Sequence, residues 1–201
     1  NMSQFEKIIT SSVVPELSKN FQKTINEIFT GTLSFINYKN YPLKLNVTNP
    51  KSVGNDRLCN IFATVSLYKT PSIIIDFGTA TTYDVINNNN EFIGGAIGAG
   101  VETSANYLID SAALLSNTDL QFPKNTIGIT TKENIQSGIM YGAIDQVEGM
   151  VKRIKKERKD NYQIIITGGL SKLLSPYLSI EHTLDMDLTL KGIIYIDQVN
   201  N

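Results

Sequence analysis

The segment IIIDFGTATTYD at residues 73–84 decides the fold class that we expect for this chain. Its first three residues are β-branched and apolar, which predicts a short buried strand that ends at Asp76. Gly78 and Thr79 then make a turn before a second strand, and a third strand is expected over residues 91–97. The three strands would form an antiparallel meander in a chain that also carries several helices.

The turn that follows Asp76 has groups suited to binding phosphate. The carboxylate could hold a cation near a phosphate, and the turn offers backbone N–H groups and the Thr79 hydroxyl to phosphate oxygens. Gly78 lets the backbone approach a ligand because it has no Cβ. A hairpin turn decorated with hydroxyl groups would have the same sequence, so this segment alone leaves both interpretations open.

A second candidate is Gly54-Asn55-Asp56-Arg57, at the start of a predicted helix. Free N–H groups and the positive end of the helix dipole favour an anionic ligand there. Arg57 could make a bidentate contact to a carboxylate, and Asp56 could accept a proton from a hydroxyl. A capping Asp beside a surface Arg is the alternative.

Glycine-rich turns mark two further places. Gly94-Gly95 and Gly98-Ala99-Gly100 stand between a predicted strand and a helix, without the G-K-[ST] of a P-loop, and would either shape a pocket or allow close packing. Thr167-Gly168-Gly169 follows a buried strand, where bare backbone could take a purine or ribose. As a generic strand-to-helix turn it would need no ligand.

Apolar periodicity predicts the remaining elements. The helix beginning at Pro15 carries Leu17, Phe21, Ile25 and Phe29 on one face. The others expected are strands at 8–10, 33–38 and 163–167, helices at 54–67, 101–115, 132–159 and 170–178, and a linker at 117–125.

The composition is that of an ordinary globular protein. The chain has 201 residues, 41% of them hydrophobic and 18% charged, with a formal net charge of -1. Near-neutral charge argues against a nucleic-acid partner. The single Cys59 cannot form an intrachain disulfide, and one Cys with one His argues against a zinc site. No apolar run approaches the ~20 residues that span a bilayer, so we expect a cytoplasmic protein without a membrane partner.

Taken in order, seven segments resemble the type III pantothenate kinases, members of the actin-like ATPase and sugar-kinase superfamily. The segments are ITSSVVPEL at 9–17, NPKSVGNDR at 49–57, IIIDFGTATTYDV at 73–85, GGAIGAGVETS at 94–104, IGITTKENIQSGIMYG at 127–142, IITGGL at 165–170 and DLTLKGIIYI at 187–196.

The resemblance implies an α/β, actin-like ATPase (ribonuclease H-like) fold, with a mixed sheet flanked by helices and an incomplete first lobe. Residues 1–72 would be the remainder of the N-terminal lobe, and 73–201 the C-terminal lobe. The implied activity is ATP-dependent phosphorylation of pantothenate to 4'-phosphopantothenate, the first step of coenzyme A biosynthesis, by a homodimer.

The resemblance also assigns site residues. Asp56 would be the general base, and Asp76 would hold a monovalent cation, K⁺ or NH₄⁺, beside Mg²⁺-ATP. Pantothenate would be bound by Gly54, Asn55, Arg57 and Thr131, and ATP by Gly78, Thr79, Thr167, Gly168 and Gly169.

The sequence departs from the family pattern in three places. The family opens with a strand and a D-x-G-N-T phosphate loop, and the given sequence begins after it. Ile129-Thr130 stands where a Lys-Asn pair is usual, and Ala99 where proline is usual. A non-catalytic or regulatory subunit that needs a partner chain carrying that loop is therefore the alternative function. Another kinase or phosphatase of the superfamily, acting on a sugar or polyphosphate, is a third.

Overall fold

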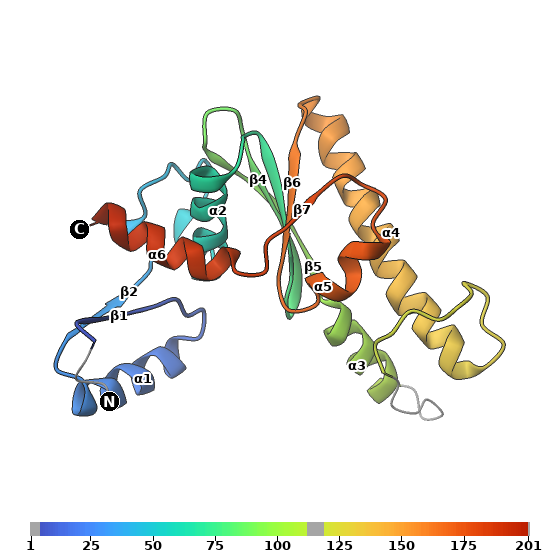
Figure 1. Ribbon diagram of the computed structural model, residues 1–201, viewed down its shortest axis with the longest axis horizontal. Coiled ribbons are helices and arrows are strands. Elements are labelled where there is room, and N and C mark those ends of the chain that lie inside the picture. Colours follow the sequence, from blue (N-terminus) through green and yellow to red (C-terminus); the bar gives the residue numbers. More distant parts are fainter. Residues whose placement is uncertain (1–4, 112–118, 201) are drawn as a thin grey trace. The chain divides into compact units, whose positions relative to one another are not determined.

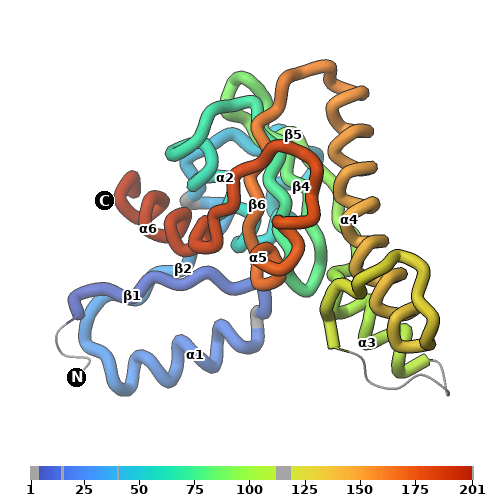
Figure 2. The backbone as a smooth tube through the Cα atoms, turned by 45° about the vertical axis from the view of Figure 1, so that its right-hand side comes forward, coloured from blue at the N-terminus to red at the C-terminus, as the bar shows by residue number. Residues whose placement is uncertain are grey.

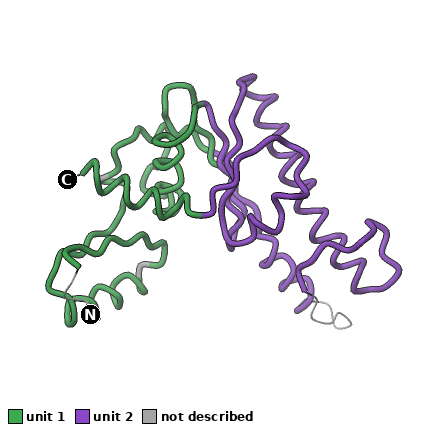
Figure 3. The backbone as a smooth tube through the Cα atoms, in the orientation of Figure 1, with its two compact units in different colours: residues 1–70, 84–94, 187–201 green, residues 71–83, 95–186 purple. Residues whose placement is uncertain are grey.

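The computed structural model describes residues 5–111 and 119–200. The chain divides into two compact units, which Figure 3 shows in different colours. Unit 1 holds residues 1–70, 84–94 and 187–201, and unit 2 holds residues 71–83 and 95–186. The division into lobes at residue 72 stays a prediction. No helix among the described residues is long and apolar enough to cross a membrane.

Unit 1 begins with a β-α-β segment (Figure 1). β1 (Lys7–Thr10) and β2 (Thr32–Phe35) pair in parallel, and α1 (Pro15–Ile28) connects them. Of the apolar face expected on this helix, Ile25 and Phe29 are buried, whereas Leu17 and Phe21 are exposed. The periodicity identified the helix, but the two described strands beside it cover only part of that face.

The core of unit 1 lies between α2 (Asn55–Leu67) and α6 (Leu188–Asn200), which pack side by side. Cys59 and Phe62 of α2 cluster with Ile36 and with Ile196 of α6. The Thr189 hydroxyl donates a hydrogen bond of 2.7 Å to Asn60 Oδ1 across the same interface. Burial of this apolar cluster stabilises α2, whose first turn carries the predicted substrate residues.

The central sheet has five strands in the order β5-β4-β3-β6-β7. The expected neighbours β3, β4 and β5 are confirmed, and β6 adds in parallel to the other side of β3. β4 and β5 each begin in one unit and end in the other. The strands are β3 (Ser72–Phe77), β4 (Ala80–Ile86), β5 (Phe92–Ala99), β6 (Gln163–Thr167) and β7 (Thr183–Leu184).

Two of the helices expected in unit 2 lie close to the predicted positions, and a third is shorter than predicted. α3 (Val101–Ser111) packs against α4 (Thr131–Arg158), as the tube in Figure 2 also shows. The end of the helix expected at 101–115 lies outside the described residues. Thr130 caps α4 in a capping box, and Lys159 ends it in the left-handed conformation. The helix expected at 170–178 is split into α5 (Ser171–Leu174) and the 3-10 turn η4 (Ser175–Tyr177).

Candidate functional site

The first group of predicted site residues lies in unit 2, where β3 and β6 end. Asp76 is opposite Thr167 in the parallel register of these strands. Both strands then lead into a turn, and the carboxyl ends of parallel strands meet at one edge of a sheet. The turn at Gly78 and the turn at Gly168 are therefore neighbours, although some ninety residues of sequence separate them.

Gly168 packs directly against Asp76. Its φ is +96°, and a Cβ at this position would overlap Asp76 Oδ1 and the backbone of Phe77. Only a glycine lets the backbone at residue 168 approach the carboxylate this closely. A carboxylate is a hard oxygen ligand of the kind that K⁺ or Mg²⁺ takes, although among the described residues no group of three or more acidic, His or Cys side chains surrounds a metal position. Asp76 would be the side chain that holds it.

The Gly78-Thr79 turn is exposed but well fixed. The Thr79 carbonyl accepts hydrogen bonds from the Gly100 N–H (3.1 Å) and from the Thr103 hydroxyl (2.8 Å). The Gly78 N–H donates to the Ala80 carbonyl at 3.2 Å, so this N–H is used inside the turn. These bonds anchor the turn through backbone atoms, and the exposed Thr79 side chain is the group suited to reach a phosphate.

The turn after β6 presents open backbone. Gly169 is exposed, and a Cβ added there would meet no atom within 4 Å. The Ser171 hydroxyl and the Ser171 N–H both donate to the Gly168 carbonyl, at 2.5 and 3.1 Å. The turn is therefore rigid on one side and accessible on the other, which suits a flat ligand such as a nucleobase or ribose.

Thr131 lies in a pocket of about 740 Å³ that belongs entirely to unit 2. The pocket is formed by the end of β5 with α3 and α4, and its volume is in the range of small-molecule sites. Asn134 and Gln146 give it amide groups, and Leu108 and Ile135 give it apolar walls. Thr131 itself is exposed at the first turn of α4.

The second group of predicted residues lies in unit 1, at the N-terminus of α2. Gly54 is the N-cap, and Asn55 Nδ2 donates to the Ser12 carbonyl at 2.7 Å. Asp56 is exposed, and its Oδ1 accepts a hydrogen bond of 2.7 Å from the Arg57 N–H. The helix tip thus presents an oriented carboxylate to solvent, as a general base requires.

Arg57 is held by an acidic residue that the sequence motifs did not single out. Its Nε and Nη2 donate to Asp84 Oδ1 at 2.9 and 2.5 Å, and Asp84 is fully buried. Asp84 stands at the end of the quoted 73–84 segment, but its spacing from Arg57 has no periodic pattern. Only the position of β4 beside α2 could have revealed the pair.

Burial shifts the pKa of two residues in the same part of unit 1. Burial raises the pKa of Tyr41, and the nearby Cys59 and Asp84 raise it further. Burial likewise raises the pKa of Cys59 to about 11. Both groups therefore stay neutral at pH 7.

Comparison with known proteins places the chain among enzymes. The chain is 39% identical over 197 residues to the type III pantothenate kinase of Sulfurihydrogenibium sp., covering 98% of this chain and 78% of that protein. It is 39% identical over 193 residues to the type III pantothenate kinase of Persephonella marina, covering 92% of this chain and 73% of that protein.

Solved structures identify the fold. A Baf family protein of Campylobacter jejuni matches with a TM-score of 0.69 at 18% identity, covering 98% of this chain and 84% of that one. MreB 5 of Spiroplasma citri matches with a TM-score of 0.50 at 11% identity, covering 96% and 68%. The expected actin-like ATPase fold is confirmed.

The model of one protein family also matches, over residues 1–153, and its description is type III pantothenate kinase. That match covers well over half of the chain and includes both groups of predicted site residues up to Thr131. This chain belongs to the type III pantothenate kinase family.

Proposed function

We propose that this chain transfers the γ-phosphoryl group of ATP to the primary hydroxyl of pantothenate, which yields 4'-phosphopantothenate for coenzyme A synthesis. Besides family membership, one observation carries the proposal. The N-terminus of α2 presents the exposed Asp56 carboxylate, oriented by the Arg57 N–H, next to a guanidinium that suits an acid substrate.

Asp56 is the general base in this proposal. The pantothenate hydroxyl oxygen forms a bond to the γ-phosphorus while the bond from that phosphorus to the β,γ-bridging oxygen breaks. The hydroxyl proton passes to the Asp56 carboxylate, and ADP leaves with the electron pair of the broken bond. Phosphoryl transfer depends mainly on positioning and charge neutralisation, so a single base and fixed binding groups suffice.

The remaining residues bind the two substrates. Gly54, Asn55, Arg57 and Thr131 bind pantothenate, and the carboxylate of this substrate pairs with Arg57. Gly78 and Thr79 bind ATP phosphate, while Thr167, Gly168 and Gly169 receive the nucleoside. Asp76 holds the monovalent cation, which supplies positive charge near the phosphates together with Mg²⁺.

We also propose that the enzyme works in the cytoplasm as a homodimer or together with a second chain that adds phosphate contacts. Two apolar side chains just before Thr131 support an assembly. Ile127 is 85% exposed and Ile129 is 91% exposed. An assembly that covered these two side chains would remove their apolar surface from water.

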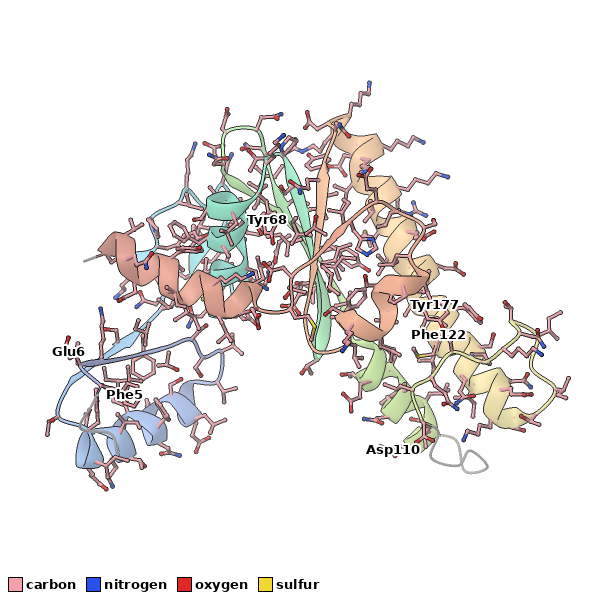
Figure 4. The ribbon with its side chains drawn as sticks, in the orientation of Figure 1. Phe5, Glu6, Tyr68, Asp110, Phe122 and Tyr177 are labelled. Carbon is pink, nitrogen blue, oxygen red and sulfur yellow. The ribbon has the colours of Figure 1, made fainter. Side chains whose placement is uncertain are left out.

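The test is coupled ADP release by the full-length protein with pantothenate, ATP, Mg²⁺ and K⁺. The Asp56→Asn variant keeps the size of the side chain but cannot take the proton, so kcat should fall ~10²–10⁴-fold. Asp110→Asn is the matched control, because Asp110 is an exposed carboxylate on α3 (Figure 4) and should keep its rate. Absence of turnover by the wild type, or an unchanged rate in Asp56→Asn, would refute the proposal.

A further inference from the structure

Arg57 is held on two sides by residues from β4 and β5, in the parts of these strands that belong to unit 1. Asp84 of β4 accepts hydrogen bonds from Nε and Nη2 with a single oxygen, Oδ1. Phe92 of β5 lies under the guanidinium, with Arg57 Cζ 5.4 Å from the ring centroid. Cation–π attraction and two charge-assisted hydrogen bonds together fix the plane of the guanidinium.

The supporting residues are themselves rigid. Asp84 is fully buried and Phe92 is 1% exposed. The backbone of Phe92 accepts from the Asn46 N–H at 2.8 Å and donates to the Lys44 carbonyl at 3.2 Å. A movement of Arg57 would therefore have to break a buried ion pair or displace a core aromatic residue.

The two hydrogen bonds to Asp84 use one edge of the guanidinium, and a second edge remains available to a ligand. Of the five N–H groups of an arginine, Asp84 occupies two, which leaves those of Nη1 and the second N–H of Nη2. These N–H groups form the end-on edge that binds a carboxylate in a bidentate manner. The Arg57 side chain is 15% exposed, so part of it reaches solvent.

A buried ion pair is a poor device for stability alone. Removal of two charges from water costs about as much as their attraction returns, and apolar residues often do as well. The ion pair has a clear advantage if the function of Arg57 requires a fixed orientation of its guanidinium. We infer that Asp84 is a positioning residue that orients Arg57 for the carboxylate of the acid substrate, with Phe92 as its platform.

This inference rests on the proposed function, and it identifies how the enzyme distinguishes an acid from a neutral substrate. A preorganised guanidinium binds a carboxylate without first ordering its own side chain. Loss of the anchor should therefore weaken recognition of the carboxylate group, while a substrate that lacks this group should be affected little.

The experiment compares pantothenate with its alcohol analogue, in which CH₂OH replaces the carboxylate. We expect the kcat/KM ratio of the two substrates to fall about tenfold in Asp84→Val, which cannot accept a hydrogen bond. Asp84→Asn keeps an acceptor oxygen and should retain more of the selectivity. In the Arg57→Met background the Asp84 substitutions should leave the ratio unchanged, because Asp84 acts through Arg57.

The control is Thr189→Val, which removes the partly buried hydrogen bond to Asn60 in the same unit. It should lower the melting temperature and leave the selectivity ratio as in the wild type. If Asp84→Val does not fold, the test uses Asp84→Asn instead. A kcat/KM ratio in this variant below that of the wild type supports the inference. An unchanged ratio would overturn it. An increased ratio would also overturn it, because Asp84 would then act as a counter-charge that weakens Arg57.

The proposed function can fail separately. If the wild type phosphorylates neither substrate, the kinase proposal is wrong. If the wild type phosphorylates pantothenate but the Asp84 substitutions leave the kcat/KM ratio of the two substrates unchanged, only the positioning role is wrong.

Discussion

Gly168 lies against the carboxylate of Asp76, so that a side chain at residue 168 would occupy the space of Asp76 Oδ1 and of the Phe77 backbone. The contact joins two turns that follow neighbouring parallel strands, β3 and β6. It links the residue proposed to hold the cation with the turn proposed to receive the nucleoside. A change at either residue should therefore affect ATP binding.

Gly168→Ala should destabilise the protein and weaken ATP binding. The left-handed φ of +96° disfavours any side chain, and the Phe77 backbone cannot move away easily. The expected loss is about 1–3 kcal/mol in the free energy of unfolding. Urea denaturation measures it, with Gly169→Ala as the stability control, because a Cβ at Gly169 meets nothing within 4 Å. Equal stability of the two variants would show that residue 168 does not need to be a glycine.

Gly54→Ala should reduce turnover without unfolding the chain. The φ of Gly54 is −60°, which alanine adopts readily, but its Cβ would stand 2.6 Å from Asp56 Oδ1. The flexible carboxylate would move, and a displaced base should lower kcat about tenfold or more. Steady-state kinetics and a thermal melt separate the two effects. A full kcat at normal stability would mean that Asp56 does not act from its observed position.

Cys59 should resist thiol reagents in the native protein. It is fully buried, and burial is the main cause that raises its pKa to about 11. The reactive thiolate is then only about one part in ten thousand at pH 7. Labelling with a chromogenic disulfide should proceed only as the chain unfolds, and the same reaction in urea gives the reference rate. Rapid labelling under native conditions would show that the α2–α6 core opens.

Glu133 should make stability depend on pH. Its pKa is lowered chiefly because the Ile129 N–H donates to its carboxylate at 2.9 Å, with further donation from Thr130. Because the pKa is lower in the folded state, the contribution is present at neutral pH and is lost as pH falls through the folded pKa. The stability difference between the wild type and Glu133→Gln should thus shrink in acid. Chemical denaturation between about pH 7 and pH 3 measures it, and a difference independent of pH would contradict it.

Most of the elements could be predicted from sequence because their signals are local. The apolar period of α4 located its start within one residue of Thr131, and the capping box at Thr130 was recognised only in the structure. The run before Asp76 identified β3, and the turn at Gly78 followed from it. Periodicity could not predict which apolar residues of α1 are buried, because Leu17 lies on the same predicted face as Ile25 but is exposed.

By itself, the sequence determined most of the helices and strands, the start of α2 with Asp56, and the turns that follow Asp76 and Thr167, because each depends on residues within a few positions of one another. It did not predict α6 or β7, and it predicted one helix where α5 and η4 lie. Only the tertiary structure decided that Asp76 lies opposite Thr167 and that Asp84 holds Arg57. Those pairs arise from strand order and from packing of a helix on a sheet. Such contacts join distant segments, and no local pattern of side chains encodes them.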